Sequence, residues 1–192
     1  MNQDIFKKHL PKLRNLTVAN PRLIIAFSGV PGSGKSDLAR AIEARYQGVR
    51  VANDDIRGIL DKLGIHRDAS HKQALLEEYL LALLEELVAY PNGLLILDSS
   101  IDRKYAKVKA VASEHDYKIF VIQLEAPRSE LRHRIRVRDK SKHNYLDYFR
   151  EFDRWESDHD SFVANIQANY VWDQGKQKSP EGLYAQLDAL IN

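Results

Sequence analysis

The stretch FSGVPGSGKSDLAR, residues 27 to 40, contains Gly29, four further residues, and then Gly34, Lys35 and Ser36. It follows an apolar run of strand length and precedes a segment with helical character. Glycine reaches backbone angles that are forbidden to other residues, so successive N–H groups can turn inward around an anion. The start of the following helix adds further donors and partial positive charge. This placement predicts a phosphate-binding turn.

The positions of this turn have expected parts in binding a nucleoside triphosphate with Mg²⁺. Backbone N–H groups of residues 31 to 36 hold the phosphates, and the Lys35 ammonium reaches the outer ones. The Ser36 hydroxyl is a ligand for Mg²⁺, while the ring of Pro31 stiffens the turn. The predicted ATP-binding residues are Gly29, Pro31, Gly32, Ser33, Gly34, Lys35 and Ser36.

Short apolar stretches alternate with helical patterns along the rest of the chain. Strands are expected over residues 22–29, 48–53, 93–100, 117–127 and 168–175. Helices are expected over about 35–45, 55–63, 71–89, 103–115, 128–138, 144–158 and 179–191. Such alternation predicts an α/β fold, in which a parallel sheet is covered by helices on both faces.

The length and composition limit the remaining choices. The chain has 192 residues, which fits a single domain with a helical extension over residues 1–20. Its formal net charge of +2 is too small to imply nucleic-acid binding by itself. The absence of cysteine excludes a disulfide framework and a thiol nucleophile. No apolar run is long enough to cross a bilayer and no signal peptide is evident, so we expect a cytoplasmic protein without a membrane partner.

Acidic residues follow two of the expected strands. In VANDDIR, either Asp54 or Asp55 could cap the next helix, and the other could accept a proton from an attacking hydroxyl. Arg57 could hold a polar or anionic acceptor. Asp98, in GLLILDSS, either points toward the metal or caps a turn. Both stretches lie at the carboxyl edge of the sheet, where ligands of such folds bind.

A basic stretch, PRSELRHRIRVRDKSKH, carries five arginines and two lysines between Arg128 and Lys142. Arg134 and Arg138 are four residues apart, so they share one face of a helix. Three interpretations remain open: stabilisation of a transferring phosphoryl group, contact with nucleic-acid phosphates, or a solvated surface paired with acids.

Four pieces, GVPGSGKS, NDDIR, LILDSS and APRSELRHRIRVRD, occur in this order within residues 23 to 139. In this respect the chain resembles the P-loop kinases related to phage-type polynucleotide 5′-hydroxyl kinase, a set that includes zeta toxins, gluconate kinase and chloramphenicol phosphotransferase. The resemblance implies a three-layer α/β/α P-loop NTPase fold of nucleotide-kinase type. It further implies five parallel strands in the order 2-3-1-4-5 and a lid over about residues 128–143.

The resemblance also implies roles for individual residues. Asp54 matches the general base of that group, and Arg57 matches an arginine that contacts the acceptor. Arg134 and Arg138 match arginines that reach the phosphates from the lid helix. Asp98 matches an aspartate beside the metal and the acceptor, so Ser36 and Asp98 are the expected Mg²⁺ ligands.

The expected activity is transfer of the ATP γ-phosphoryl group to a hydroxyl of a small-molecule or nucleotide-like acceptor. A polynucleotide 5′-hydroxyl kinase, or another nucleic-acid-associated ATPase, is the first alternative. A regulatory protein that binds ATP without catalysis is the second. The aromatic residues between 145 and 155 could form a packed helix face, an acceptor wall or an oligomer contact. The identity of the acceptor and the oligomeric state stay open.

Overall fold

The computed structural model describes residues 21–62, 69–90, 93–139, 145–176 and 179–191. Its strands are β1 (Leu23–Ser28), β2 (Val49–Ala52), β3 (Leu94–Ser100), β4 (Lys118–Glu125) and β5 (Tyr170–Asp173). Its helices are α2 (Lys35–Tyr46), α3 (Asn53–Lys62), α4 (Ala69–Val88), α5 (Tyr105–Glu114), α6 (Arg128–Asp139), α7 (Tyr145–Asn165) and α8 (Glu181–Ile191). The expected extension over residues 1–20 and the last part of the expected lid, residues 140–143, lie outside the described residues.

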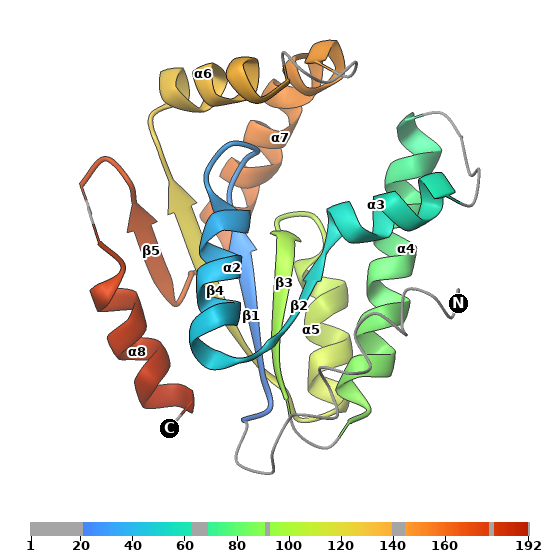
Figure 1. Cartoon of the computed structure of the whole chain (residues 1–192), viewed down its shortest axis with the longest axis vertical. Helices are drawn as coiled ribbons and strands as arrows, with labels where there is room; N and C mark the ends of the chain where they lie inside the picture. The colour runs from blue at the N-terminus through green and yellow to red at the C-terminus, as the bar shows by residue number, and fades with distance from the viewer. Residues whose placement is uncertain (1–20, 63–68, 91–92, 140–144, 177–178, 192) are drawn as a thin grey trace.

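The five strands form one parallel sheet in the order β2-β3-β1-β4-β5, which confirms the predicted order (Figure 1). Because β1 lies in the middle, its carboxyl end sits between the ends of β3 and β4. Every residue of β1 is buried, as expected for a strand covered on both faces. The turn that follows β1 therefore leaves the sheet at the point where ligands of open α/β sheets bind.

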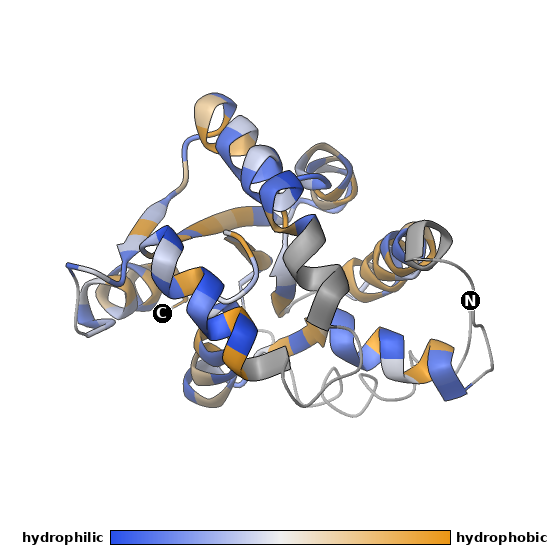
Figure 2. Cartoon of the chain, turned by 90° about the horizontal axis from the view of Figure 1, so that it is seen from above, coloured by the Kyte–Doolittle hydropathy of each residue, from blue (hydrophilic) through white to orange (hydrophobic). Residues whose placement is uncertain are grey.

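Alternate side chains of the central strands point to opposite faces and fill two separate cores. Ile24, Leu95 and Leu97 pack with α3, α4 and α5 on one face. Ile25, Phe27 and Ile96 pack with α2 and α8 on the other face. Figure 2 shows the apolar strands in the centre, with helices of mixed polarity around them. Burial of these apolar side chains on both faces is the main stabilising contribution to the three-layer arrangement.

A third, smaller cluster joins the helix pair α6 and α7 to the turn after β1. Val30 of that turn packs with Leu131 and Ile135 of α6 and Phe152 of α7. All four side chains are buried. Apolar contacts therefore hold the basic helix α6 over the turn. Figure 1 shows α6 above the carboxyl end of the sheet.

The element boundaries differ from the sequence prediction at a few ends. Helix α3 begins at Asn53, which we had expected to be the last strand residue, and α7 continues to Asn165 instead of ending near 158. The extra turns of α7 carry buried Phe162, which packs against Tyr105 with ring centroids 5.6 Å apart. Within the described ranges, no helix has both the length and the apolar character that a membrane span requires.

Candidate functional site

The turn between β1 and α2 has the backbone geometry that its glycines predict. Gly29, Gly32 and Gly34 have φ values of 142°, 85° and 86°, which L side chains rarely adopt. A Cβ atom on Gly29 would lie 2.9 Å from both the Leu124 carbonyl oxygen and Ser33 Oγ. The turn is thus pressed against β4, and helix α2 starts directly after it at Lys35. Backbone N–H groups and the positive end of α2 consequently meet at one place.

The Lys35 ammonium lies inside this turn. Its Nζ donates hydrogen bonds to the carbonyl oxygens of Gly29 and Val30, each at 2.8 Å, and to Ser33 Oγ at 3.2 Å. These acceptors are neutral dipoles, so a phosphate oxygen would be a stronger partner for the same cation.

Ser36, in the first turn of α2, and Asp98, near the end of β3, are hydrogen-bonded to each other. Ser36 Oγ donates to Asp98 Oδ1 at 2.7 Å, and Arg50 Nη1 lies 2.6 Å from Asp98 Oδ2. The Asp98 side chain is 3% exposed, so this arginine supplies the charge partner that a buried carboxylate requires. Arg50 also donates to Glu43 of α2 at 2.8 Å, which links α2, β2 and β3.

A hydroxyl and a carboxylate are the oxygen ligands that Mg²⁺ prefers, so Ser36 and Asp98 fit this ion. Among the described residues, no group of three or more His, Cys, Asp and Glu side chains is arranged around a common metal position. That agrees with the usual binding mode of Mg²⁺, which takes one or two protein oxygens and completes its shell with phosphates and water.

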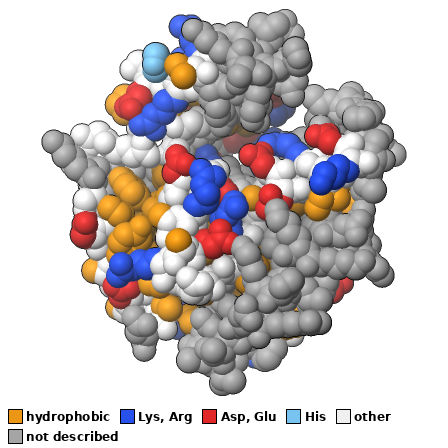
Figure 3. Space-filling model, viewed as in Figure 1, with side chains coloured by type: hydrophobic (Ala, Val, Ile, Leu, Met, Phe, Trp, Pro, Cys, Tyr) orange, Lys and Arg blue, Asp and Glu red, His pale blue; other side chains and the backbone are white. Residues whose placement is uncertain are grey.

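A cleft of about 900 Å³ extends from the phosphate-binding turn. Asp54 and Arg57 of α3 line it, and Arg57 Nη1 lies 2.6 Å from Asp54 Oδ1. Asp55 does not line the cleft, so the structure separates the two adjacent aspartates. Of the described side chains in Figure 3, basic and acidic groups lie interspersed over α2 and α3 rather than in a single basic patch.

Arg134 of α6 lies against the phosphate-binding turn. Its Nη1 donates to the Gly32 carbonyl oxygen at 3.1 Å and to Gln174 Oε1 at 2.7 Å, and its Nη2 lies 2.5 Å from Glu130. Gln174 in turn donates from Nε2 to the Ser33 carbonyl oxygen. Helix α6 and the loop after β5 therefore both contact the phosphate-binding turn. Arg138 belongs to the last turn of α6, and its side chain lies outside the described residues.

Other arginines of α6 face the neighbouring helix instead. Arg128 lies 2.7 Å from both Asp153 and Glu156 of α7, and Arg132 lies 2.6 Å from Asp153. Acidic residues of α7 thus offset the positive charges of Arg128 and Arg132. For these two arginines, the interpretation as a surface paired with acids fits the structure.

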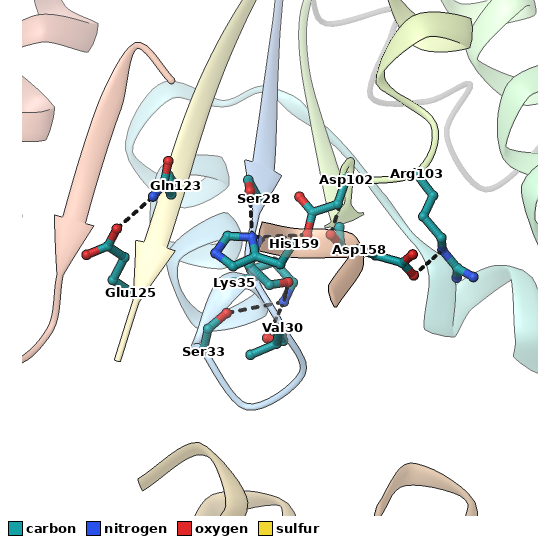
Figure 4. Close-up of polar contacts among 12 residues, drawn as sticks. Ser28, Val30, Ser33, Lys35, Asp102, Arg103, Gln123, Glu125, Asp158 and His159 are labelled. Carbon is teal, nitrogen blue, oxygen red and sulfur yellow. Dashed lines mark hydrogen bonds and ion pairs between the residues drawn. The ribbon is translucent and has the colours of Figure 1, made fainter. Parts of the chain in front are cut away.

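Ser28, Asp102 and His159 form a partly buried contact, with His159 reaching from α7 to the end of β1 (Figure 4). His159 Nδ1 lies 3.1 Å from Ser28 Oγ and 3.2 Å from Asp102 Oδ2, which also accepts from the Gly29 N–H at 3.4 Å. Burial raises the pKa of Asp102, but hydrogen bonds from His159 and Ser28 outweigh it and leave the pKa below its ordinary value. Asp102 is therefore an anion that ties α7 to the turn.

Lys104 ends the turn before α5 and lines the same cleft. It is 7% exposed, and its Nζ donates to Ser99 Oγ at 3.0 Å. Burial, followed by the charges of Arg103 and Arg57, lowers the pKa of this ammonium to about 8, although Glu77 acts in the opposite direction. At neutral pH the group is still mostly a cation.

Sequence reasoning did not single out Arg50, Asp102, Lys104, Gln174 and His159. Arg50 carried a usable signal, because an arginine inside the apolar strand VRVA needs a buried acid as its partner. The other four residues lie on turns or on one turn of a long polar helix, where such residues are normally solvated.

Comparison with known proteins places this site in a family. A family model described as an AAA domain matches residues 24–162, which is more than half of the chain. The chain belongs to this AAA-domain family. The matched region of this AAA-domain protein includes the phosphate-binding turn, Asp54, Asp98 and the lid helix, and it implies nucleotide binding. No curated protein matches it in sequence.

Solved structures agree with the fold. A candidate kinase from Chloroflexus aurantiacus is 16% identical, with a TM-score of 0.57 over 90% of this chain and 100% of that one. Kti12 from Chaetomium thermophilum, bound to ADP-AlF3, is 18% identical, with a TM-score of 0.54 over 88% of this chain and 99% of that one. Shikimate kinase from Acinetobacter baumannii, in complex with shikimate, is 18% identical, with a TM-score of 0.53 over 87% of this chain and 91% of that one. At such low identity they show the fold alone, an α/β P-loop NTPase fold of nucleotide-kinase type.

Proposed function

We propose that this protein is an ATP-dependent phosphotransferase that moves the γ-phosphoryl group to a hydroxyl of a small-molecule acceptor. The observation that carries the proposal is the shared cleft, which has the phosphate-binding turn at one end and Asp54 with Arg57 on its wall. A nucleotide and an acceptor bound in one cleft can react directly, because proximity removes much of the entropic barrier.

At the nucleotide end, backbone N–H groups of residues 31–36 bind the phosphates and the Lys35 ammonium exchanges its carbonyl partners for phosphate oxygens. Ser36 and Asp98 would hold Mg²⁺, which supplies charge neutralisation for the phosphates. The hydrogen bond from Arg50 keeps the Asp98 carboxylate in place.

At the acceptor end, Asp54 accepts the proton of the attacking hydroxyl. The acceptor oxygen forms a bond to the γ-phosphorus, the bond from that phosphorus to the bridging oxygen breaks, and ADP leaves with the electron pair. The Asp54 side chain is 80% exposed and pairs with the Arg57 guanidinium, so the carboxylate is accessible to a ligand.

Arg134 is the lid residue that stabilises the charge of the transferring group. Its guanidinium lies at the phosphate-binding turn in contact with the Gly32 carbonyl oxygen, so a short rearrangement brings it to a phosphate. We assign the same role to Arg138 on sequence spacing alone. Pairing of Arg128 and Arg132 with acids of α7 favours a small acceptor over a polynucleotide, because it removes cations that a nucleic-acid backbone would need.

Asp54→Asn tests the proposal, with Asp55→Asn as a matched control. We expect Asp54→Asn to bind Mg·ATP with unchanged affinity in calorimetry and to transfer phosphate to the acceptor at least about 100-fold more slowly. Asp55→Asn removes an equal charge from the next position, outside the cleft, and should change the rate less than about threefold.

The acceptor for this test comes from a screen of hydroxyl compounds and oligonucleotides with labelled ATP. Unchanged turnover in Asp54→Asn would exclude Asp54 as the base. Tight ATP binding by the wild-type protein with no labelled product from any compound would favour the regulatory alternative.

A further inference from the structure

The most unusual charge in the cleft is the Lys104 ammonium. The side chain is more than nine-tenths buried, yet in the described part of the chain no carboxylate lies within ion-pair distance of it. Its one hydrogen-bond partner there is the Ser99 hydroxyl, which is neutral. A buried ammonium is costly unless it is paired with an anion, and here Glu77 and Asp102 act on it only from beyond ion-pair distance.

The neighbouring cations are already matched with acids. Arg57 pairs with Asp54 at 2.6 Å and Arg103 pairs with Asp158 at 3.5 Å, and these side chains also line the cleft. Of these three cations, Lys104 is the one for which the described residues supply no ion pair.

The position of Lys104 places this charge on the acceptor side of the reaction. Ser99, its partner, directly follows Asp98 in β3, while Arg57 lies on α3 and contributes to the charge around Lys104. Helix α5 begins directly after Lys104 and adds the partial positive charge of its first turn. The nucleotide phosphates bind instead at the turn formed by residues 29–36.

We propose that the acceptor carries an oxyanion, a carboxylate or a phosphate monoester, and that Lys104 is the residue that binds it. This inference rests on the proposed phosphotransferase function. The oxyanion pairs with the Lys104 ammonium while a separate hydroxyl of the same small molecule faces Asp54, so one group gives affinity and orientation and the other reacts.

The first experiment uses the wild-type protein and matched compounds that differ only in the oxyanion. With the phosphate-binding turn saturated by Mg·ADP, thermal unfolding is followed in glucose, glucuronate and glucose 6-phosphate, and in ribose and ribose 5-phosphate. We expect at least one charged compound to raise Tm by about 3 °C or more, and its neutral counterpart to leave Tm unchanged. A response to glucuronate indicates a carboxylate site, and a response to the sugar phosphates indicates a phosphate site.

The second experiment uses Lys104→Met, which keeps the length of the side chain and removes its charge. Lys109→Met is the matched control, because Lys109 is an exposed lysine of α5 that does not line the cleft. We expect Lys104→Met to unfold at a higher temperature than wild type without ligand and to lose the response to the charged compound. Lys109→Met should keep that response in full.

The results separate this inference from the proposed function. A wild-type protein that binds no Mg·ADP overturns the proposed function itself. Binding of Mg·ADP with equal responses to charged and neutral compounds, or with none to either, overturns the oxyanion site alone. A lower Tm for Lys104→Met together with a retained response would show a structural lysine and also overturn it.

Discussion

The phosphate end of the cleft is formed by one unbroken stretch, residues 29–36, whereas the acceptor end collects side chains from α3, β3 and the turn before α5. The first end works through backbone N–H groups whose directions follow from glycine conformations. The second works through charges that become neighbours only when distant segments pack together. Nucleotide binding is therefore encoded locally in this chain, while the proposed acceptor end depends on the arrangement of its elements.

Gly29→Ala should have the largest effect, because it attacks the backbone of the phosphate end. The new Cβ would stand 2.9 Å from the Leu124 carbonyl oxygen, at a φ of 142° that alanine adopts only under strain. We expect a loss of about 3 kcal/mol in the free energy of unfolding and no detectable Mg·ATP binding. Chemical denaturation and calorimetry measure the two effects. Gly58→Ala, in α3 with open space around its Cβ position, serves as the control.

Arg50→Met should rank second, because it leaves the buried Asp98 carboxylate without its ion pair. The expected loss is about 2 kcal/mol in the free energy of unfolding. The double variant Arg50→Met, Asp98→Asn should recover part of this loss, since no unpaired buried charge remains. Recovery would show that support of Asp98 is the main role of Arg50. If the double variant is less stable than Arg50→Met, the packing of the arginine itself matters more.

Arg134→Gln and Arg128→Gln compare two arginines of one helix and should show the smallest effect on stability. Arg134 contacts the phosphate-binding turn, whereas Arg128 pairs with acids of α7 at the surface. We expect kcat to fall at least about tenfold in Arg134→Gln and less than about twofold in Arg128→Gln. Steady-state kinetics measures kcat for both variants. Equal decreases in kcat would show that the two arginines do not differ in function.

Much of the fold could be predicted because the relevant signals are local. The apolar strand β1, the glycine positions of the turn and the helix after it are adjacent in sequence, and the order of the five strands agrees with the expected one. The end of α7 was predicted less well. Residues 157–161 are a polar run, and Phe162 beyond it packs against α5 and extends the helix past the point that the local pattern suggests.

The acceptor side was less accessible to sequence reasoning for a physical reason. Asp54 and Asp55 are equivalent in the sequence, and only the orientation of α3 decides which of them lines the cleft. Lys104 and His159 look like ordinary polar residues until the turn before α5 and the helix α7 bury them. Burial changes the energetics of such groups, and burial is a property of the packed chain.

The sequence by itself determined a phosphate-binding turn in a parallel α/β sheet, because glycine conformations and the alternation of apolar strands with helices depend on neighbouring residues. Only the packed chain shows that Arg50 supports Asp98 and that Lys104 keeps its charge inside the cleft. Those outcomes depend on contacts between residues far apart in the chain, where the cost of burying a charge selects its partner.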